Sequence, residues 1–163
     1  MSASDKPIGA SEESLPPSVQ SDAFNHAILR VARLHRMLAA QLLRRVGLYP
    51  GQELVMMQLW DRGPQRQADL VRMLGSDAAT MTRTVQRLEH AGFVRRTPSP
   101  DDKRATIIES TAAGLALRGQ VEALWAELEQ RTTAGLTAEQ RAAVIETLDQ
   151  VARGLARATE KPD

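Results

Sequence analysis

The sequence contains no cysteine among its 163 residues. This absence excludes disulfides, thiolate metal sites, cysteine nucleophiles and thiol-based redox sensing. Aromatic residues make up only 3% of the chain, whereas hydrophobic residues as a whole make up 42%. Leucine, alanine, valine and methionine must therefore form most of the core, which favours packed helices over a β-sandwich.

Long apolar runs are absent as well. No apolar stretch approaches 18 residues, and no basic region followed by an apolar run marks the N-terminal segment as a secretion signal. We therefore expect a protein that has no membrane partner and works in the cytoplasm.

The side chains that most enzyme sites require are scarce. The three histidines, His26, His35 and His90, lack the helical spacing of a metal site, and no glycine-rich phosphate loop is present. The adjacent acids Asp101 and Asp102 fall in a turn, which is a poor place for two carboxylates with tuned pKa values. The sequence thus predicts no enzyme activity, no metal site and no cofactor.

The charges that are present are unevenly distributed. Residues 1–22 carry one basic and four acidic side chains, residues 23–106 carry 14 basic and seven acidic ones, and residues 107–163 carry six and nine. A basic middle between acidic ends is typical of a chain that meets a polyanion with one part. A chance fluctuation of solvated surface charge is the alternative, so charge alone does not decide.

The chain is predicted to fold from residue 22 to residue 158. Residues 1–21 are rich in serine, proline and acids and are expected to form a disordered acidic arm, while residues 159–163 form a short tail. An apolar stripe over residues 24–42 predicts a helix of about six turns, capped by Asp22 and ended by Gly47.

Three shorter helical segments follow, and then a hairpin. The helices are expected over residues 50–63, 66–75 and 76–92, the first with Pro50 in its first turn and the last capped by Ser76 or Asp77. The tight junction after Gly75 is typical of helix-turn-helix units.

Two β-prone runs, "FVRRT" and "RATIIE", flank the turn sequence "PSPDD" and predict a hairpin. Thr111 is the expected cap of a second long helix. Thr137 and Gln140 form the capping box of the last one. A hairpin directly after a helix-turn-helix is a wing.

The helix predicted before the hairpin has two different faces. Met81, Val85 and Leu88 form an apolar seam, and threonine, arginine and glutamine occupy the other side. Such a helix can lie in the major groove of DNA, where Arg and Gln bond two atoms of one base edge. An ordinary amphipathic helix with solvated bases is the alternative reading. The predicted DNA-binding side chains, including four in the hairpin, are Thr80, Thr82, Arg83, Gln86, Arg87, Arg95, Arg96, Lys103 and Arg104.

The segment "DLVRMLGSDAATMTRTVQRLEHAGFVRRTPSPDDKRATIIESTAAG" resembles the DNA-binding segment of the multiple antibiotic resistance regulator (MarR) family. Its most specific pieces are "TMTRTVQRLEHAGFVRR" and "DDKRA". The resemblance implies a mainly α fold with a small β-hairpin wing. A winged helix-turn-helix at residues 50–110 would be flanked by long N- and C-terminal dimerisation helices at residues 22–46 and 112–158. It also implies a homodimeric, ligand-responsive repressor that binds a pseudo-palindromic operator in double-stranded DNA.

The resemblance assigns roles within the wing. The family's wing signature, an acid two residues before an arginine, falls on Asp102 and Arg104. By resemblance Arg104 enters the minor groove and Asp102 braces a basic side chain, although two adjacent aspartates also simply favour a turn. Ser110 stands where the family usually has leucine. The cysteine of the family's peroxide-sensing branch is absent.

Three residues are candidates to line a pocket for a small-molecule effector, namely His35, Met56 and Trp60. Core packing is the alternative for each of them. Two other functions also stay open: a winged-helix module that binds protein, and an architectural protein that binds DNA without sequence preference.

Overall fold

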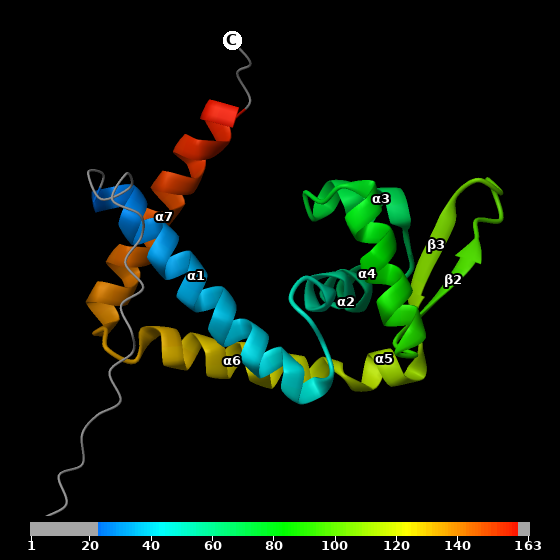
Figure 1. The fold of residues 1–163 in the computed structure, drawn as a ribbon, viewed down its shortest axis with the longest axis horizontal. Helices are drawn as coiled ribbons and strands as arrows, with labels where there is room; N and C mark the ends of the chain where they lie inside the picture. The colour runs from blue at the N-terminus through cyan, green and yellow to red at the C-terminus, as the bar shows by residue number, and fades with distance from the viewer. Residues whose placement is uncertain (1–22, 160–163) are drawn as a thin grey trace, which may run out of the picture. The chain divides into compact units, whose positions relative to one another are not determined.

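The structure of the protein, a computed structural model, describes residues 23–159 (Figure 1). The predicted acidic arm, the predicted cap Asp22 and residues 160–163 of the predicted tail lie outside the described residues. The chain divides into two compact units, residues 1–37 and 38–163, and each is described by itself.

Most of helix α1 (Ala23–Leu43) belongs to the first unit. The helix confirms the one predicted from the stripe over residues 24–42. A short 3-10 turn, Arg44–Val46, follows it. Gly47 then closes the turn in the left-handed conformation at φ 75°, which a residue with a side chain rarely adopts.

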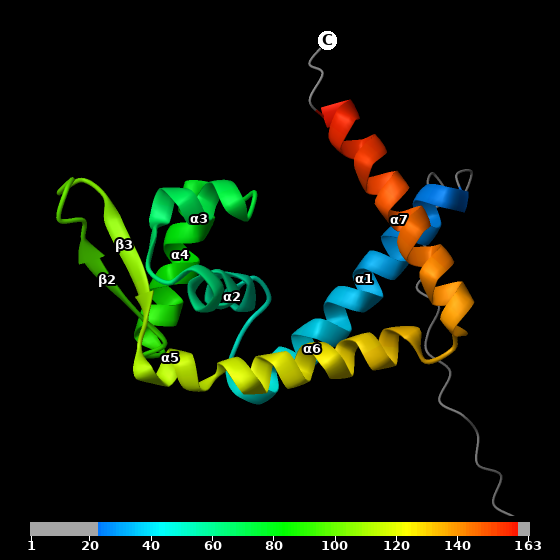
Figure 2. The same cartoon turned by 180° about the vertical axis from the view of Figure 1, so that it is seen from behind.

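The second unit contains the predicted order of elements. It consists of α2 (Gln52–Arg62), β1 (Gln65–Arg66), α3 (Gln67–Met73), α4 (Ala78–His90), β2 (Val94–Pro98), β3 (Thr106–Ser110), α5 (Ala112–Ala116), α6 (Arg118–Thr133) and α7 (Ala138–Thr159). Helices α2, α3 and α4 gather beside the hairpin, and α6 leads from there toward α7 (Figures 1 and 2).

Local capping explains where three of these helices begin. The Asp77 carboxylate accepts the N–H of Thr80 at 2.7 Å, and the Thr111 hydroxyl accepts the N–H of Gly114 at 3.1 Å. Thr137 and Gln140 accept each other's backbone N–H, at 3.2 and 2.9 Å. These bonds satisfy N–H groups that have no partner inside a helix, and they confirm the predicted caps.

One predicted helix start is wrong. Pro50 was expected in the first turn of the second helix, but α2 begins at Gln52 after Gly51, which has a φ of 93°. Because Gly51 has a left-handed backbone conformation, a right-handed helix cannot run through it from Pro50. The second long helix also differs from expectation, because a turn at Leu117 divides it into α5 and α6.

The sheet has three antiparallel strands in the order β1-β3-β2. The predicted hairpin pairs Val94 with Ser110 at its base and Pro98 with Thr106 near its tip. The two-residue strand β1 pairs with the other edge of β3 and was not predicted, because two residues show no periodicity.

The main core lies beneath the three short helices and the hairpin. Its fully buried side chains are aliphatic, as the low aromatic content predicted, and come from α2, α3, α4, both hairpin strands and α6. They are Val55, Met56, Leu70, Val85, Leu88, Val94, Ile108 and Val121, and Leu48 of the loop before α2 joins them. Gly114 brings α5 so close that a β-carbon there would lie 2.1 Å from the Phe93 carbonyl oxygen. No helix within residues 23–159 is long and apolar enough to cross a bilayer.

Candidate nucleic-acid interface

Helix α4 turns its apolar seam inward and its polar side outward. Met81, Val85 and Leu88 are buried in the core, as predicted, whereas Arg83 and Arg87 are exposed. The buried seam fixes the rotation of the helix about its axis, so its outer face is a stable polar surface.

A chain of hydrogen bonds orders the start of this surface. The Thr80 hydroxyl donates to Asp77 at 2.7 Å, and Arg83 Nη2 donates to the Thr80 hydroxyl oxygen at 3.1 Å. The bond from the Thr80 N–H is the main cause that lowers the pKa of Asp77, and the bond from the Thr80 hydroxyl adds to it. Thr80 therefore positions Arg83, whose remaining N–H groups can bond a ligand.

Thr82 does not lie on the outer face, where it was predicted. It is half-buried, accepts a bond from Gln67 Nε2 at 2.9 Å and donates to the Ala78 carbonyl oxygen at 2.9 Å. The flank of α4 that carries Thr82 faces α3, so this side chain connects the two helices of the helix-turn-helix.

A groove of 730 Å³ runs along the outer face of α4. It is lined by Gly47, Tyr49, Gln52, Arg83, Gln86, Arg87, His90 and Ala91. The wall formed by residues 47–52 was not predicted from the sequence, because a helix was expected to begin at Pro50 and α2 begins at Gln52. Tyr49 is 60% exposed. Its N–H donates to Gln52 Oε1 at 2.9 Å and its carbonyl oxygen accepts from the Gln52 N–H at 3.0 Å, which fixes the wall.

Two of the four bases in the hairpin are paired with acids. Arg95 of β2 bonds Glu109 of β3, and Arg96 bonds Oε2 of Glu89 on α4 through Nε at 2.8 Å and Nη2 at 2.6 Å. The hydrogen bond from Arg96 lowers the pKa of Glu89, and the one from Arg95 lowers that of Glu109. The ion pair between Arg96 and Glu89 links strand β2 of the wing to helix α4.

The two bases at the hairpin tip are unpaired. The side chains of Lys103 and Arg104 are exposed and have no hydrogen bond or ion pair within residues 23–159. Asp102 was expected to brace a basic side chain. Instead, its Oδ1 accepts the backbone N–H of Arg104 at 2.9 Å, so the carboxylate stabilises the turn. The tip therefore presents two available cations on an ordered backbone.

The structure shows the surroundings of two of the three candidates for an effector pocket, Met56 and Trp60. Met56 is fully buried in the core, which agrees with core packing, the alternative considered for this residue. His35 belongs to the first unit and is not placed relative to the other two. Trp60 donates its indole N–H to the Gly114 carbonyl oxygen at 3.0 Å.

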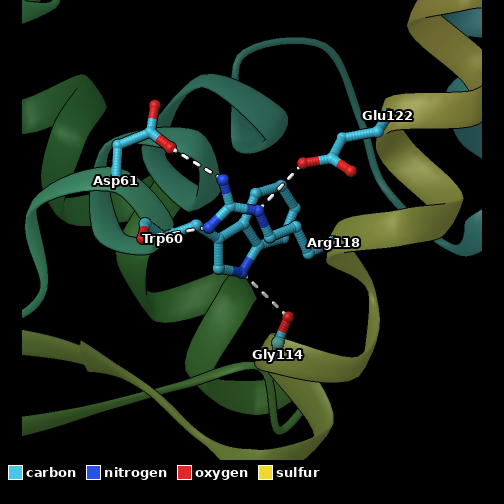
Figure 3. Close-up of polar contacts among 5 residues, drawn as sticks. All are labelled: Trp60, Asp61, Gly114, Arg118 and Glu122. Atoms are coloured by element: carbon cyan, nitrogen blue, oxygen red, sulfur yellow. Dashed lines mark hydrogen bonds and ion pairs between the residues drawn. The ribbon is translucent and has the colours of Figure 1, made fainter.

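A different pocket lies beside Trp60, between α2 and α6. Arg118 donates to Glu122 Oε1 at 2.9 Å, to Asp61 Oδ1 at 3.2 Å and to the Trp60 carbonyl oxygen at 3.3 Å (Figure 3). The bond to Glu122 is the main cause that raises the pKa of Arg118. The pocket has a volume of 230 Å³, and its lining includes the ring of Trp125, whose indole N–H is buried without a partner.

Three short helices with a wing packed against the third define a winged helix-turn-helix protein. Within residues 23–159, no cluster of three or more His, Asp or Glu side chains could hold a metal ion. The elements that would meet DNA in this class are the outer face of α4 and the tip of the wing.

Comparison with known proteins identifies the family. The MarR family matches residues 48–106. The transcriptional repressor NicR of Pseudomonas putida is 27% identical over 145 residues, which cover 89% of this chain and 91% of NicR. YfiV of Bacillus subtilis, an uncharacterized helix-turn-helix transcriptional regulator, is 31% identical over 108 residues, covering 66% of this chain and 67% of YfiV.

Solved structures agree with these sequence relatives. A mutant of Escherichia coli MarR in complex with operator DNA superposes with a TM-score of 0.75 at 25% identity, covering 84% of this chain and 99% of that one. The chain belongs to the MarR family. This confirms both the resemblance noted in the sequence and the predicted fold class.

Proposed function

We propose that the protein is a transcriptional regulator that binds a specific double-stranded DNA site as a homodimer. The observation that carries the proposal is the outer face of α4, where Arg83, Gln86 and Arg87 line one groove while the opposite face is buried. Arg and Gln side chains at this position of a winged helix are suited to bond base edges in the major groove. The E. coli relative was solved in complex with operator DNA, which supports a DNA-binding role.

The wing completes the interface. Arg104 enters the adjacent minor groove, where the negative potential is strongest when the groove is narrow, and Lys103 contacts the backbone beside it. Arg95 and Arg96 are paired with Glu109 and Glu89, so they contribute a fixed framework and a smaller share of the DNA contacts. Thr80 acts through Arg83, and Thr82 acts by holding α3 against α4.

The homodimer forms through the long helices. Helix α7 has no buried residue and exposes Val144, Ile145, Leu148 and Leu155. A two-fold dimer places two recognition helices roughly 34–36 Å apart, which matches successive major grooves. The operator is then a pseudo-palindrome, and repression follows where it overlaps a promoter. The repressor NicR supports this outcome. The protein works in the cytoplasm and is not an enzyme.

The pocket between α2 and α6 is the proposed effector site. It places the Arg118 cation beside Trp60 and Trp125, so it suits a small, partly apolar molecule with hydrogen-bond acceptors. A ligand there changes DNA affinity only if it prefers one spacing of the two recognition helices. The two tryptophans of the chain, Trp60 and Trp125, both line the pocket. Binding is therefore expected to change tryptophan fluorescence, and Trp125→Phe should remove most of the change.

The main proposal is tested by selecting bound duplexes from a randomised DNA pool at near-physiological salt. Enrichment of a pseudo-palindrome with half-sites about one helical turn apart is the expected result. No enrichment from a folded, dimeric protein would favour the other two functions. A salt titration on arbitrary DNA then separates them, because only an architectural binder retains strong, salt-dependent affinity for any duplex.

A further inference from the structure

The strand of DNA that separates the two grooves must pass close to this protein. If α4 lies in the major groove and the wing tip in the neighbouring minor groove, one sugar-phosphate backbone runs between them. This step rests on the proposed function. The surface between the helix-turn-helix and the wing tip is therefore where a phosphate would be met.

The structure has a hollow at this place. Its volume is 410 Å³, and it lies between the start of α3 and the turn of the hairpin. Arg66 and Gln67 form one wall, and Asp102, Arg104 and Thr106 form the other. The remaining lining residues are Ala68, Val71, Ala78 and Ala105, so the positive charge of the hollow comes from the two arginines.

Arg66 is fixed through its backbone while its side chain is available. It is the second residue of β1 and pairs with Ile107 of β3, so the same sheet that carries the wing holds its Cα. It occupies the cap position of α3 without making a side-chain cap. The exposed guanidinium has no hydrogen bond or ion pair within residues 23–159.

Arg104 faces the hollow from the wing under similar conditions. The bond from its N–H to Asp102 holds its backbone, and its side chain is unpaired in the described part of the chain. The Asp102 carboxylate accepts this bond and also lines the hollow, so it offsets part of the positive charge of the two arginines. The hollow thus gathers two unpaired guanidinium groups, in contrast to Arg95 and Arg96, which each have an acid partner.

We propose that Arg66 binds one phosphate of the DNA strand that passes between α4 and the wing, at the point where Arg104 passes the same strand to enter the minor groove. A guanidinium offers paired N–H donors that match two phosphate oxygens. Arg66 is then a backbone contact that fixes how deeply the wing enters the minor groove. It carries no sequence information, because every phosphate is alike.

The test measures binding of a selected operator by Arg66→Ala and Arg66→Met, the second of which keeps the aliphatic stem. Both should bind about tenfold more weakly to every duplex tested, with an unchanged sequence preference. The slope of log affinity against log salt should fall by about 1. Arg153→Ala is the matched control, because it removes the same charge from the exposed surface of α7, on the side opposite its apolar stripe. Thermal unfolding should not change in any of these variants.

A second measurement locates the contact on the DNA. Single phosphates of the operator are replaced by uncharged methylphosphonates, one position at a time. One replacement between the two grooves should weaken the wild-type protein as much as Arg66→Ala does and should remove the effect of that variant. Arg66→Ala and Arg104→Ala should also be non-additive on the natural duplex, since Arg66 fixes how deeply Arg104 enters the minor groove.

Several outcomes would overturn the assignment. These are unchanged affinity of the Arg66 variants, an equal loss in Arg153→Ala, or strict additivity together with the absence of any phosphate whose replacement removes the effect of Arg66→Ala. A wild-type protein that binds no duplex would instead refute the proposed function itself, so the two failures are distinguishable.

Discussion

Helices α4 and α7 have the same sequence pattern and opposite surroundings. Each carries large apolar residues at intervals of three and four. In α4, Val85 and Leu88 are 0% exposed, whereas in α7 Leu148 is 55% and Leu155 is 59% exposed. The pattern predicts which face of a helix is apolar, and it does not say what covers that face.

The difference shows where the chain is self-sufficient. Residues of α2, α3, α6 and the hairpin strands cover the apolar seam of α4. The stripe of α7 has no such cover within its unit, and a contiguous apolar face on one helix marks an interaction surface. Together with membership of the MarR family, this difference supports the proposal that the first region reads DNA and the second mediates assembly.

The largest expected effect comes from a charge placed in the stripe of α7. Leu148→Asp should convert the dimer to monomers, because a carboxylate cannot be buried between two apolar helices without a partner. Operator affinity should then fall at least about a hundredfold, since linkage of two half-site contacts typically supplies that much. Sedimentation velocity and fluorescence anisotropy measure the two effects.

Gln150→Asp is the matched control, because it adds the same carboxylate to the same helix outside the stripe. It should leave both assembly and affinity unchanged. A Leu148→Asp protein that remains dimeric would show that the apolar stripe of α7 does not form the dimer interface.

Truncation of one leucine in each helix should separate folding from assembly. Leu88→Ala leaves a cavity in the core and should lower the free energy of unfolding by about 2–5 kcal/mol, while the folded protein stays dimeric. Leu148→Ala should weaken the dimer and leave the fold of the DNA-binding lobe intact. Urea unfolding and sedimentation velocity of both variants check this. A dimer weakened by Leu88→Ala alone would contradict it.

Contact and assembly can be separated on DNA as well. Arg104→Ala should cost about 1–3 kcal/mol of binding free energy on a full operator, because it removes one minor-groove contact per subunit. It should also weaken binding to an isolated half-site. Leu148→Asp should leave affinity for a half-site unchanged. Anisotropy titrations on the two duplexes distinguish these cases, and unchanged binding of Arg104→Ala at moderate salt would exclude that contact.

Local chemistry explains what the sequence could predict. Helix periodicity, capping side chains and turn residues act over a few positions, and they correctly predicted α1, α4, the hairpin and the caps at Asp77, Thr111 and Thr137. The motif in the wing added the family, which the comparisons then confirmed.

The parts that could not be predicted depend on distant neighbours. Strand β1 exists only because β3 offers a free edge, and Thr82 is drawn inward only because Gln67 of α3 lies beside it. Tyr49 lines the groove along α4 because Gly47 and Gly51, which both have positive φ angles, determine the course of the loop before α2. A role for Arg66 could not be predicted for the same reason, since no neighbouring residue in the sequence indicates that the wing tip lies opposite Arg66.

The smallest expected effect concerns a buried acid in the DNA-binding lobe, where burial costs stability. Glu53 of α2 is 6% exposed, and its Oε2 is buried without a partner. Burial raises the pKa of this carboxyl above its ordinary value of 4.5, although the backbone N–H groups of Glu53 and Gly51 oppose the shift. The folded state therefore favours the protonated form. Its stabilising effect is present below the ordinary pKa and is lost as the pH rises through the raised one.

Glu53→Gln should remove this cost, because the amide is neutral at every pH and keeps an oxygen that can accept the backbone N–H groups. At pH 8 the free energy of unfolding should rise by about 1 kcal/mol, which corresponds to a gain of roughly 2–4 °C in Tm. Near pH 4 the variant and the wild type should unfold at nearly the same temperature. Glu146→Gln on the exposed surface of α7 is the control and should change neither value. Equal Tm values at pH 8 for Glu53→Gln and the wild type would mean that the carboxylate has a hydrogen-bond partner in solution, and that its burial does not lower the stability of the DNA-binding lobe.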